Sequence, residues 1–184
     1  IKNALGIELP EYIDGYGEVK PFAGAFARDK ENVKVAAKRR AVNPGESKML
    51  DSIEAAIDAV GLKDGMTVSF HHHLRNGDKV VNMVMQAIAK KGIKDIRLAA
   101  SGIFACHEPL IELMEQGVIT SMVASTFNVG PVAKAVTAGK LQKPAILQTH
   151  GGRPRAIEAG ELHIDVAFIG APTCDPLGNM NGTQ

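Results

Sequence analysis

The strongest constraint on the fold is an alternation of apolar runs and amphipathic stretches between residues 66 and 172. The apolar runs have the length and composition of β-strands, and they cover residues 66–70, 95–101, 119–125, 144–150 and 165–172. The stretches between them carry apolar residues at helical spacing, and they cover residues 78–92, 107–117, 130–140 and 153–162. Strands that alternate with helices over short links predict βαβ units in a parallel sheet. Because the strands are continuously apolar, we expect an α/β fold with both faces of the sheet covered.

The chain before residue 66 divides into two parts. Residues 1–45 mix glycine, proline and aromatic residues without a helical or strand period, so we expect an irregular segment that wraps over a core. Residues 46–61 place apolar side chains on one helical face and end in a glycine, which predicts a helix. The preceding Asn43, Pro44 and Glu46 are typical of a helix start, with Asn43 as the N-cap.

The length of the chain bounds its domain organisation. Its 184 residues are sufficient for one domain with a substantial core and too few for two. The chain has no initial Met and ends in the turn-like run GNMNGTQ, so we expect it to be a piece of a longer protein. Part of the catalytic machinery then lies outside these residues.

Composition argues against several classes of function. The net charge is +1 and no long basic block is present, so a nucleic-acid surface has little support. No apolar stretch approaches the about 18 residues that a membrane span needs. The two cysteines, Cys106 and Cys174, are far apart and have no C-x-x-C spacing, so we expect a reducing, cytoplasmic setting.

Five segments follow the predicted strands, and their composition differs from that of the rest of the chain. The carboxyl ends of parallel strands lie at one edge of a sheet, where open α/β sheets bind ligands at the topological switch point. We therefore expect these segments to form the site. They contain five of the six histidines and both cysteines: HHHLRNGD, SGIFACHE, STFNVG, THGGRPR and TCDPLGN.

The first of these segments has three consecutive histidines, His71, His72 and His73. Neighbours in an extended chain point to opposite faces, so the three cannot easily converge on one metal ion, and we predict no metal site. Anion binding, proton transfer and ordinary packing remain open for these side chains. Arg75 can bind a carboxylate through two hydrogen bonds, whereas Asn76 with its following glycine is equally typical of a turn.

The segment THGGRPR ends a strand and begins a helix. His150 precedes Gly151 and Gly152, whose successive backbone N–H groups are suited to an oxyanion or a carboxylate. Arg153 and Arg155 add positive charge beside them. A Gly-Gly pair is also common in tight turns before helices, so the pair alone does not assign a function.

The remaining segments are less informative. Cys106 and His107 are adjacent in sequence, which is not the arrangement of a catalytic dyad, so we interpret Cys106 as a helix-start or buried thiol. Asp175 and Asn179 lie in a run that favours a turn, although Asn179 is also a candidate for substrate binding. Neither of the familiar glycine-rich phosphate-binding motifs is present in the sequence.

Four stretches together carry a resemblance to a known family: IELPEYIDGYGEVKPFAGAFA, FHHHLRNGD, HGGRPRAIEAGELHIDVAFIGAP and CDPLGNMNG. They resemble the α subunit of bacterial citrate lyase, the citrate CoA-transferase subunit, along essentially the whole chain. The C-terminal pattern is shared with the broader CoA-transferase superfamily. The resemblance implies a three-layer α/β/α sandwich with a mostly parallel sheet. Residues 46–184 are then the first of two related domains, truncated at the C-terminal end.

The resemblance also implies a reaction and its partners. Such a subunit exchanges acetyl for citryl on a thioester of the CoA type, carried by an acyl carrier protein, and acetate leaves. A citryl lyase subunit then cleaves the citryl thioester, so we expect a cytoplasmic hetero-oligomer with no permanently bound cofactor. The implied chemistry is attack by a citrate carboxylate through an anhydride, which requires two anions to be oriented and an oxyanion to be stabilised.

This reaction gives the candidate residues their roles. We expect His150, Gly151 and Gly152 to act on the reacting carbonyl, and the other candidates to bind substrate: His71, His72, His73, Arg75, Asn76, Arg153 and Asn179. Two alternatives use the same fold. One is an enzyme of the sugar-phosphate isomerase or deaminase type, and the other is a non-catalytic subunit that docks partner proteins.

Overall fold

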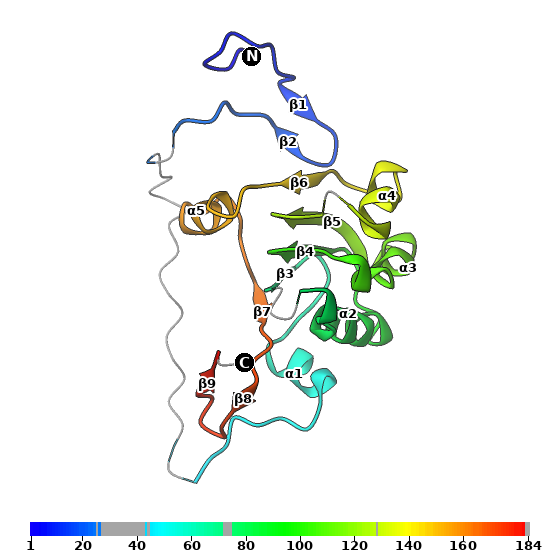
Figure 1. The fold of residues 1–184 in the computed structure, drawn as a ribbon, viewed down its shortest axis with the longest axis vertical. Coiled ribbons are helices and arrows are strands. Elements are labelled where there is room, and N and C mark those ends of the chain that lie inside the picture. Colours follow the sequence, from blue (N-terminus) through cyan, green and yellow to red (C-terminus); the bar gives the residue numbers. More distant parts are fainter. Residues whose placement is uncertain (25, 27–42, 44, 72–74, 128, 183–184) are drawn as a thin grey trace.

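The computed structural model describes residues 1–24, 26, 43, 45–71, 75–127 and 129–182. Its centre is a parallel sheet (Figure 1) made of β3 (Thr67–Phe70), β4 (Ile96–Ala100), β5 (Ile119–Ala124), β6 (Ala145–Leu147) and β7 (Val166–Phe168). The helices are α1 (Ile53–Ala59), α2 (Val80–Lys90), α3 (Leu110–Glu115), α4 (Pro131–Thr137) and α5 (Gly152–Glu158), with 3₁₀ turns η1 (Arg75–Gly77) and η2 (Ala105–His107). Each predicted strand and helix is therefore present, although several are shorter than predicted.

The order of the strands in the sheet is β6-β5-β4-β3-β7, and every neighbouring pair is parallel. The chain moves outward from β3 to β6 and then returns to the other side of β3 to form β7. The strand order reverses at this point, so the crevice expected for a ligand lies at the carboxyl ends of β3 and β7. Phe70 and Phe168 end these two strands, and their rings stack with centroids 6.1 Å apart.

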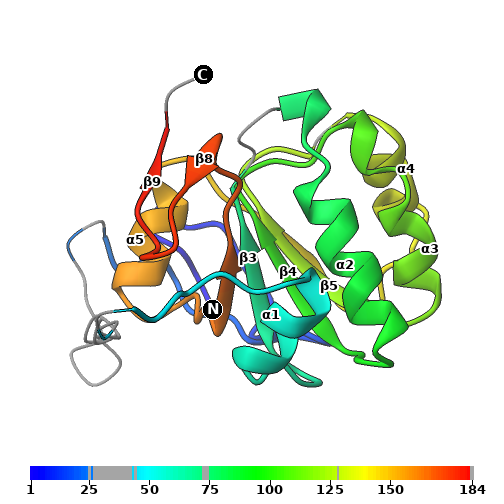
Figure 2. The same ribbon diagram turned by 90° about the horizontal axis from the view of Figure 1, so that it is seen from below.

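The same reversal distributes the helices over the two faces of the sheet. Right-handed crossovers in one direction place α2, α3 and α4 on one face, whereas the crossover from β6 to β7 runs in the opposite direction and places α5 on the other face. Figure 2 shows α5 on the opposite side of the sheet from α2, α3 and α4. The predicted α/β architecture, with a mostly parallel sheet flanked by helices, is confirmed.

The two faces of the sheet are buried to different extents. The face under α2, α3 and α4 holds the main core, in which Val68, Leu98 and Met122 align across three strands and are fully buried. The face under α5 has a smaller apolar cluster of buried residues, which is Ala99, Val123, Ala156 and Leu162. Its strands also carry polar side chains, among them Ser69 and Ser121.

The first helix begins later than predicted. Ser52 is the N-cap of α1, because its hydroxyl accepts a hydrogen bond from the amide of Ala55 at 3.0 Å. The prediction of a cap at Asn43 is therefore wrong. Instead, Asn43 and Glu46 close a separate turn, in which the Asn43 amide donates to the Glu46 carboxylate at 3.2 Å and the Glu46 amide donates to the Asn43 carbonyl at 3.0 Å.

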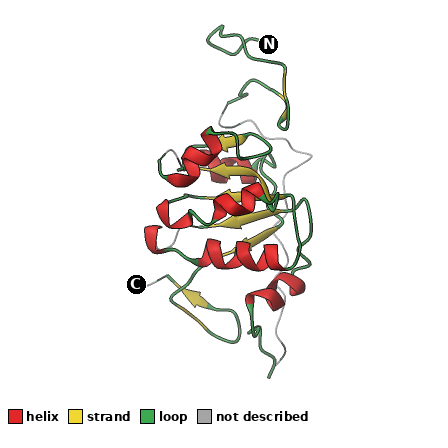
Figure 3. Cartoon of the chain, turned by 90° about the vertical axis from the view of Figure 1, so that its right-hand side faces the viewer, coloured by secondary structure: helices red, strands yellow, loops and turns green. Residues whose placement is uncertain are grey.

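Two small antiparallel pairs lie outside the main sheet. The first pairs β1 (Tyr12–Ile13) with β2 (Gly17–Glu18), and the second pairs β8 (Thr173–Cys174) with β9 (Met180–Asn181). Figure 3 shows the N-terminal pair extending from one end of the α/β body. Large apolar side chains of this segment are exposed, including Leu5 and Phe22. The division of the chain at residue 45 stays a prediction.

Candidate functional site

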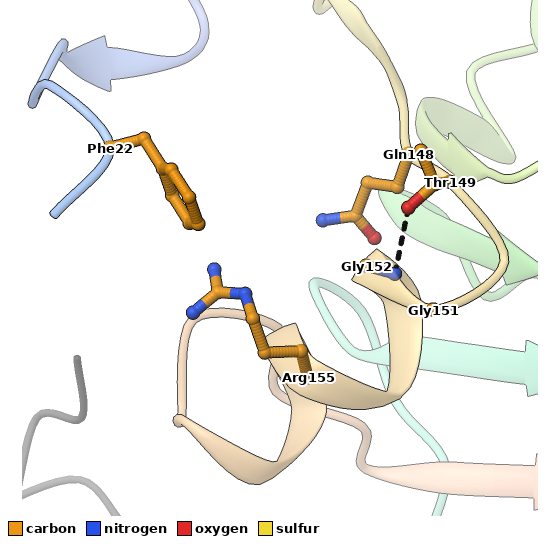
Figure 4. A pocket seen from close by; sticks show the side chains of 6 residues that line it. All are labelled: Phe22, Gln148, Thr149, Gly151, Gly152 and Arg155. Atoms are coloured by element: carbon orange, nitrogen blue, oxygen red, sulfur yellow. Dashed lines mark hydrogen bonds between the residues drawn. The ribbon is translucent and has the colours of Figure 1, made fainter. Parts of the chain in front are cut away.

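A pocket of about 440 Å³ lies where β6 ends and α5 begins. It is lined by Phe22, Gln148, Thr149, Gly151, Gly152 and Arg155. Figure 4 shows Phe22 and Arg155 facing each other across the mouth of the pocket, with the Gln148 side chain extending toward them. Both glycines of the predicted Gly-Gly pair are therefore at this pocket. Phe22, Gln148 and Thr149 were not identified as candidates from the sequence.

The start of α5 depends on Thr149. The Thr149 hydroxyl accepts a hydrogen bond from the Gly152 amide at 2.9 Å, and the Thr149 carbonyl accepts from the Arg153 amide at 3.1 Å. A Cβ atom at Gly152 would lie only 2.9 Å from the Thr149 hydroxyl oxygen, which is closer than ordinary contact. Glycine at 152 therefore allows the close approach of the capping side chain.

This cap changes the expected roles of the two glycine amides. The Gly152 N–H is already bound to Thr149, so the expectation that both amides face a ligand is corrected for Gly152. Gly151 is exposed, and its N–H has no hydrogen-bond partner among the residues that the structure describes. A Cβ at Gly151 would meet nothing within 4 Å. Of the two amides, that of Gly151 is the one suited to an anionic group.

Arg155 supplies the positive charge at this pocket. Its guanidinium carbon lies 5.1 Å from the centre of the Phe22 ring, and its Nη2 atom forms an ion pair with Glu161. The side chain is three-quarters buried, at 24% exposure, so it is held at the wall of the pocket and not extended into solvent. The charge of Arg155, the amide of Gly151 and the amide of Gln148 together form a surface suited to a carboxylate.

Arg153 points elsewhere. Its Nη2 atom donates to the Ser69 hydroxyl at 2.7 Å and to the Ala99 carbonyl at 3.1 Å, so the guanidinium lies against the sheet. Its Nε atom is buried without a partner among the described residues, and this burial lowers the pKa of Arg153. Arg153 does not line the pocket at the start of α5. It joins α5 to β3 at a position two residues before His71.

The histidine segment follows β3, at the switch point of the sheet. His71 is exposed and has an interaction partner, while His72, His73 and the side chain of Arg75 lie outside the described residues. Three strand spacings separate β3 from β6, which is about 14 Å. His71 and Gly151 therefore do not follow neighbouring strands. The Arg153 side chain connects α5, which Gly151 precedes, to β3, which His71 follows. His150 is exposed at the turn before α5 and also has an interaction partner.

The two asparagine candidates have intramolecular partners. The Asn76 side-chain oxygen accepts a hydrogen bond from the Cys106 amide at 3.0 Å. The Asn179 side-chain amide donates to the Asp175 carboxylate at 2.8 Å, and these hydrogen bonds lower the pKa of Asp175. Asn179 closes the β8–β9 hairpin, beyond β7, whereas the pocket follows β6 at the opposite edge of the sheet. The structure thus brings Asn179 and Gly151 to different ends of the sheet.

Cys106 and His107 lie in η2, where Cys106 is partly buried and His107 is fully buried. Burial raises the pKa of the Cys106 thiol, and the nearby charge of Asp78 raises it further. The pKa of His107 is lowered by burial, which outweighs the opposing effect of Asp78. The interpretation of Cys106 as a thiol at the start of a helical turn agrees with this environment. Among the described residues, no group of His, Cys, Asp and Glu side chains is arranged to hold a metal ion.

Within the part of the chain that the structure describes, no helix has the length and apolar character needed to cross a membrane.

Comparison with known proteins identifies the family. The model of the family "Citrate lyase, alpha subunit (CitF)" matches residues 46–184. The citrate lyase alpha chain of Klebsiella pneumoniae is 43% identical over 182 residues, which cover 99% of this chain and 34% of that protein. The citrate lyase alpha chain of Escherichia coli (strain K12) is 49% identical over 137 residues, which cover 74% of this chain and 27% of that protein.

A solved structure agrees with these matches. It is a crystal structure of a Streptococcus mutans protein, described as the alpha subunit of citrate lyase in complex with citrate. The TM-score is 0.82 at 44% identity, and the match covers all of this chain and 35% of that protein. This chain therefore spans about a third of the length of the Klebsiella pneumoniae and Streptococcus mutans relatives. The chain belongs to the citrate lyase alpha subunit family.

Proposed function

We propose that the full-length protein containing this chain is the citrate CoA-transferase subunit of citrate lyase. It exchanges acetyl for citryl on a thioester carried by an acyl carrier protein subunit and releases acetate. The observation that carries this proposal is the family match over residues 46–184, at 43–49% identity to citrate lyase alpha chains. The Streptococcus mutans relative in complex with citrate supports citrate as the acceptor.

The pocket at the start of α5 is our candidate for binding one citrate carboxylate. Citrate carries up to three negative charges near neutral pH, so a site for it needs fixed positive charge and hydrogen-bond donors. Arg155, which is also paired with Glu161, provides a guanidinium group, and the amide of Gly151 provides a donor on the same wall. The pocket volume of about 440 Å³ is adequate for a small tricarboxylate.

The reaction proceeds in two acyl transfers. A citrate carboxylate oxygen attacks the carbonyl carbon of the acetyl thioester, a C–O bond forms, and the C–S bond breaks to release the carrier thiolate. The thiolate then attacks the citryl carbonyl of the mixed anhydride, a C–S bond forms, and acetate leaves with the bridging oxygen. Both steps pass through tetrahedral oxyanions, which backbone N–H groups stabilise effectively. In this proposal the Gly151 amide supplies one such donor.

The histidine segment contributes a second binding region in the same proposal. His71 follows β3 at the switch point, where ligands of open α/β sheets bind. His71, His72, His73 and Arg75 then contact the remaining carboxylates of citrate, and His150 lies beside the reacting carbonyl. No cofactor is held permanently, because the acyl group arrives on the carrier protein.

The wider setting of the reaction is part of the proposal. The subunit works in a cytoplasmic hetero-oligomer with the acyl carrier protein and a citryl lyase subunit, which converts the citryl thioester to oxaloacetate. A sugar-phosphate enzyme and a purely docking subunit are not favoured by the family match.

Citrate-dependent release of acetate is the experiment that tests this function. The full-length protein is incubated with the acetylated carrier protein, with and without citrate, and free acetate is measured. We expect acetate and citryl thioester to form in equal amounts only when citrate is present. Acetate release that is independent of citrate would indicate a thioester hydrolase and contradict the proposal. Folded protein that releases no acetate would contradict it as well.

A further inference from the structure

A polar cluster beside the proposed site has no role in the reaction described above. It consists of Asn76, Asp78, Asn82, Cys106 and His107, and we call it the Cys106 cluster. Its residues come from two segments at the carboxyl edge of the sheet. After β3, Asn76 lies in η1, Asp78 in the link to α2 and Asn82 in the first turn of α2. Cys106 and His107 lie in η2, after β4.

Three polar groups of Cys106 bond to the segment after β3. Its amide donates to the Asn76 side-chain oxygen at 3.0 Å, and its carbonyl accepts from the Asn82 side-chain amide at 2.7 Å. Its thiol donates to the Asp78 carbonyl at 3.5 Å. Together these hydrogen bonds hold Cys106 in one arrangement relative to the segment after β3.

The base of the cluster is buried. Asp78 is 1% exposed and His107 is fully buried. The Phe104 amide donates to the His107 Nδ1 atom at 3.0 Å, so Nδ1 is unprotonated and a neutral His107 carries its proton on Nε2. The Nε2 donor and the Asp78 Oδ2 acceptor are both buried without a partner among the described residues, and so is the Asn82 side-chain oxygen. The buried part of the cluster thus contains one donor, His107 Nε2, and two acceptors, the side-chain oxygens of Asp78 and Asn82.

We propose that the Cys106 cluster positions η1 and the start of α2, which lie close in sequence to the proposed citrate-binding residue His71, against the loop after β4. The assignment of citrate as the ligand of His71 rests on the proposed function. Asn76 is a positioning residue in this proposal: it binds Cys106 and does not contact the substrate. Asp78 and Asn82 complete the connection, because the Asp78 carbonyl accepts from the Cys106 thiol and the Asn82 side-chain amide donates to the Cys106 carbonyl.

Burial separates this role from direct catalysis. His107 cannot reach a substrate, because none of its surface is exposed. The Cys106 thiol is kept protonated, because burial and the charge of Asp78 raise its pKa, so it is a poor nucleophile. The cluster therefore influences the reaction only through the placement of η1 and the start of α2.

Substitutions at Asn76 separate positioning from substrate contact. Asn76→Ala removes the acceptor for the Cys106 amide, whereas Asn76→Asp retains an acceptor oxygen and replaces the side-chain amide by a negative charge. The measurements are hydrogen exchange of the peptide containing the Cys106 amide and steady-state kinetics of acetate release, both in the full-length protein. The kinetics are measured in roughly 0.3–0.5 M salt, where the screening length is about 5 Å. This salt weakens the repulsion between the new negative charge of Asn76→Asp and citrate.

The proposal predicts a specific pattern. Asn76→Ala raises the exchange rate of the Cys106 amide by about 2- to 10-fold, the effect of losing one net hydrogen bond. It also lowers kcat/KM for citrate by about 10- to 100-fold, as expected when a binding region is misplaced. Asn76→Asp restores both quantities to within about threefold of the wild-type values. Unchanged exchange in Asn76→Ala would overturn the proposal.

A second result would also overturn it. If Asn76→Asp restores the exchange rate but leaves kcat/KM as low as in Asn76→Ala, Asn76 contacts the substrate directly. The exchange measurement needs no turnover, so it decides the structural connection even if the full-length protein releases no acetate from the acetylated carrier protein. Failure of the proposed function and failure of the positioning role are therefore distinguishable.

Asn82 gives an independent test on the other side of the cluster. Asn82→Ala removes the donor to the Cys106 carbonyl, and we expect it to lower kcat/KM by about 10-fold or more. Gln86 lies one turn further along α2 and is exposed, so Gln86→Ala is the matched control with unchanged kinetics. Equal kinetics for Asn82→Ala and Gln86→Ala would contradict the positioning role of the cluster.

Discussion

The substitution Gly152→Ala tests the geometry at the start of α5. The added Cβ would lie 2.9 Å from the Thr149 hydroxyl oxygen, whereas its next neighbours, the Cβ atoms of Gln148 and Thr149, would lie at ordinary distances of 3.8 and 3.9 Å. The contact is relieved only if the hydroxyl moves away. That movement breaks the hydrogen bond by which the hydroxyl caps α5, because the acceptor of the Gly152 amide is the same oxygen.

The magnitude follows from two opposing effects. Loss of a capping hydrogen bond costs about 0.5–2 kcal/mol of helix stability. Replacement of glycine by alanine at a compatible backbone position stabilises a protein by about 0.4–1 kcal/mol through the unfolded state. In the wild-type background the net effect of Gly152→Ala therefore lies between about 0.5 kcal/mol stabilising and about 1.5 kcal/mol destabilising.

The background Thr149→Ala makes Gly152→Ala more favourable. Without the hydroxyl, neither the close contact nor the cap exists, so only the favourable unfolded-state effect of Gly152→Ala remains, at about 0.4–1 kcal/mol. The double-mutant cycle should then give a coupling energy equal to the cost of the lost cap, about 0.5–2 kcal/mol. The assay is hydrogen exchange of peptides covering residues 149–159 in the full-length protein, converted to free energies of local opening.

Gly151→Ala is the matched control in the same cycle. Its Cβ meets nothing within 4 Å, so its coupling to Thr149 should lie within about 0.5 kcal/mol of zero. The reasoning is refuted if Gly152→Ala has the same effect on local stability in both backgrounds. It is refuted equally if Gly151 and Gly152 show the same coupling to Thr149.

Three further predictions concern charge and burial. Arg155→Gln should raise KM for citrate by about 10-fold or more, because it removes the guanidinium charge at the pocket while keeping a similar shape. An unchanged KM would exclude Arg155 from the site. Arg153→Met should lower the stability of the α5–β3 contact by about 1.5–3 kcal/mol, because the charged hydrogen bonds to Ser69 and Ala99 are lost. Hydrogen exchange of peptides covering residues 149–159 measures this loss of local stability. Burial lowers the pKa of His107 below its ordinary value of about 6.5, so the unfolded state binds a proton first as the pH falls. The stability contributed by neutral His107 is thus present above pH 6.5 and lost below it, down to the lowered pKa of the folded protein. We expect the Tm of the wild-type protein to fall between pH 7 and pH 5, and that of His107→Asn to fall less. Equal falls in the wild type and the variant would contradict the role given to His107.

The sequence was sufficient to predict the sheet and the helices around it. Continuous apolar runs identify strands that are buried on both faces, and the links between them are short enough to require crossovers. The strand order was not predicted, because the position of β7 beside β3 depends on which edge the last crossover reaches. The first helix begins at Ile53, after its cap Ser52, and not near Asn43. Both residue types are good caps, so the sequence did not decide between them.

The candidate site was predicted in part. The Gly151–Gly152 pair lies at a pocket, as its position between a strand and a helix indicated. Two residues along a helix are about 200° apart, so Arg153 and Arg155 could not both face that pocket, and helical geometry alone would have shown this. Thr149 also carried a signal, as a capping residue three positions before Gly152. Phe22 had none, because it reaches the pocket from a segment more than 120 residues earlier in the chain.

Transfer of oxygen from citrate to acetate is the most direct test of the central claim. The full-length protein is supplied with the acetylated carrier protein and with citrate labelled with oxygen-18 in its carboxylates, over many turnovers in unlabelled water. The proposed anhydride route predicts that each acetate released carries one labelled oxygen. Acetate without label would show that water is the acceptor of the acetyl group, and it would contradict assignment of this protein as a citrate CoA-transferase.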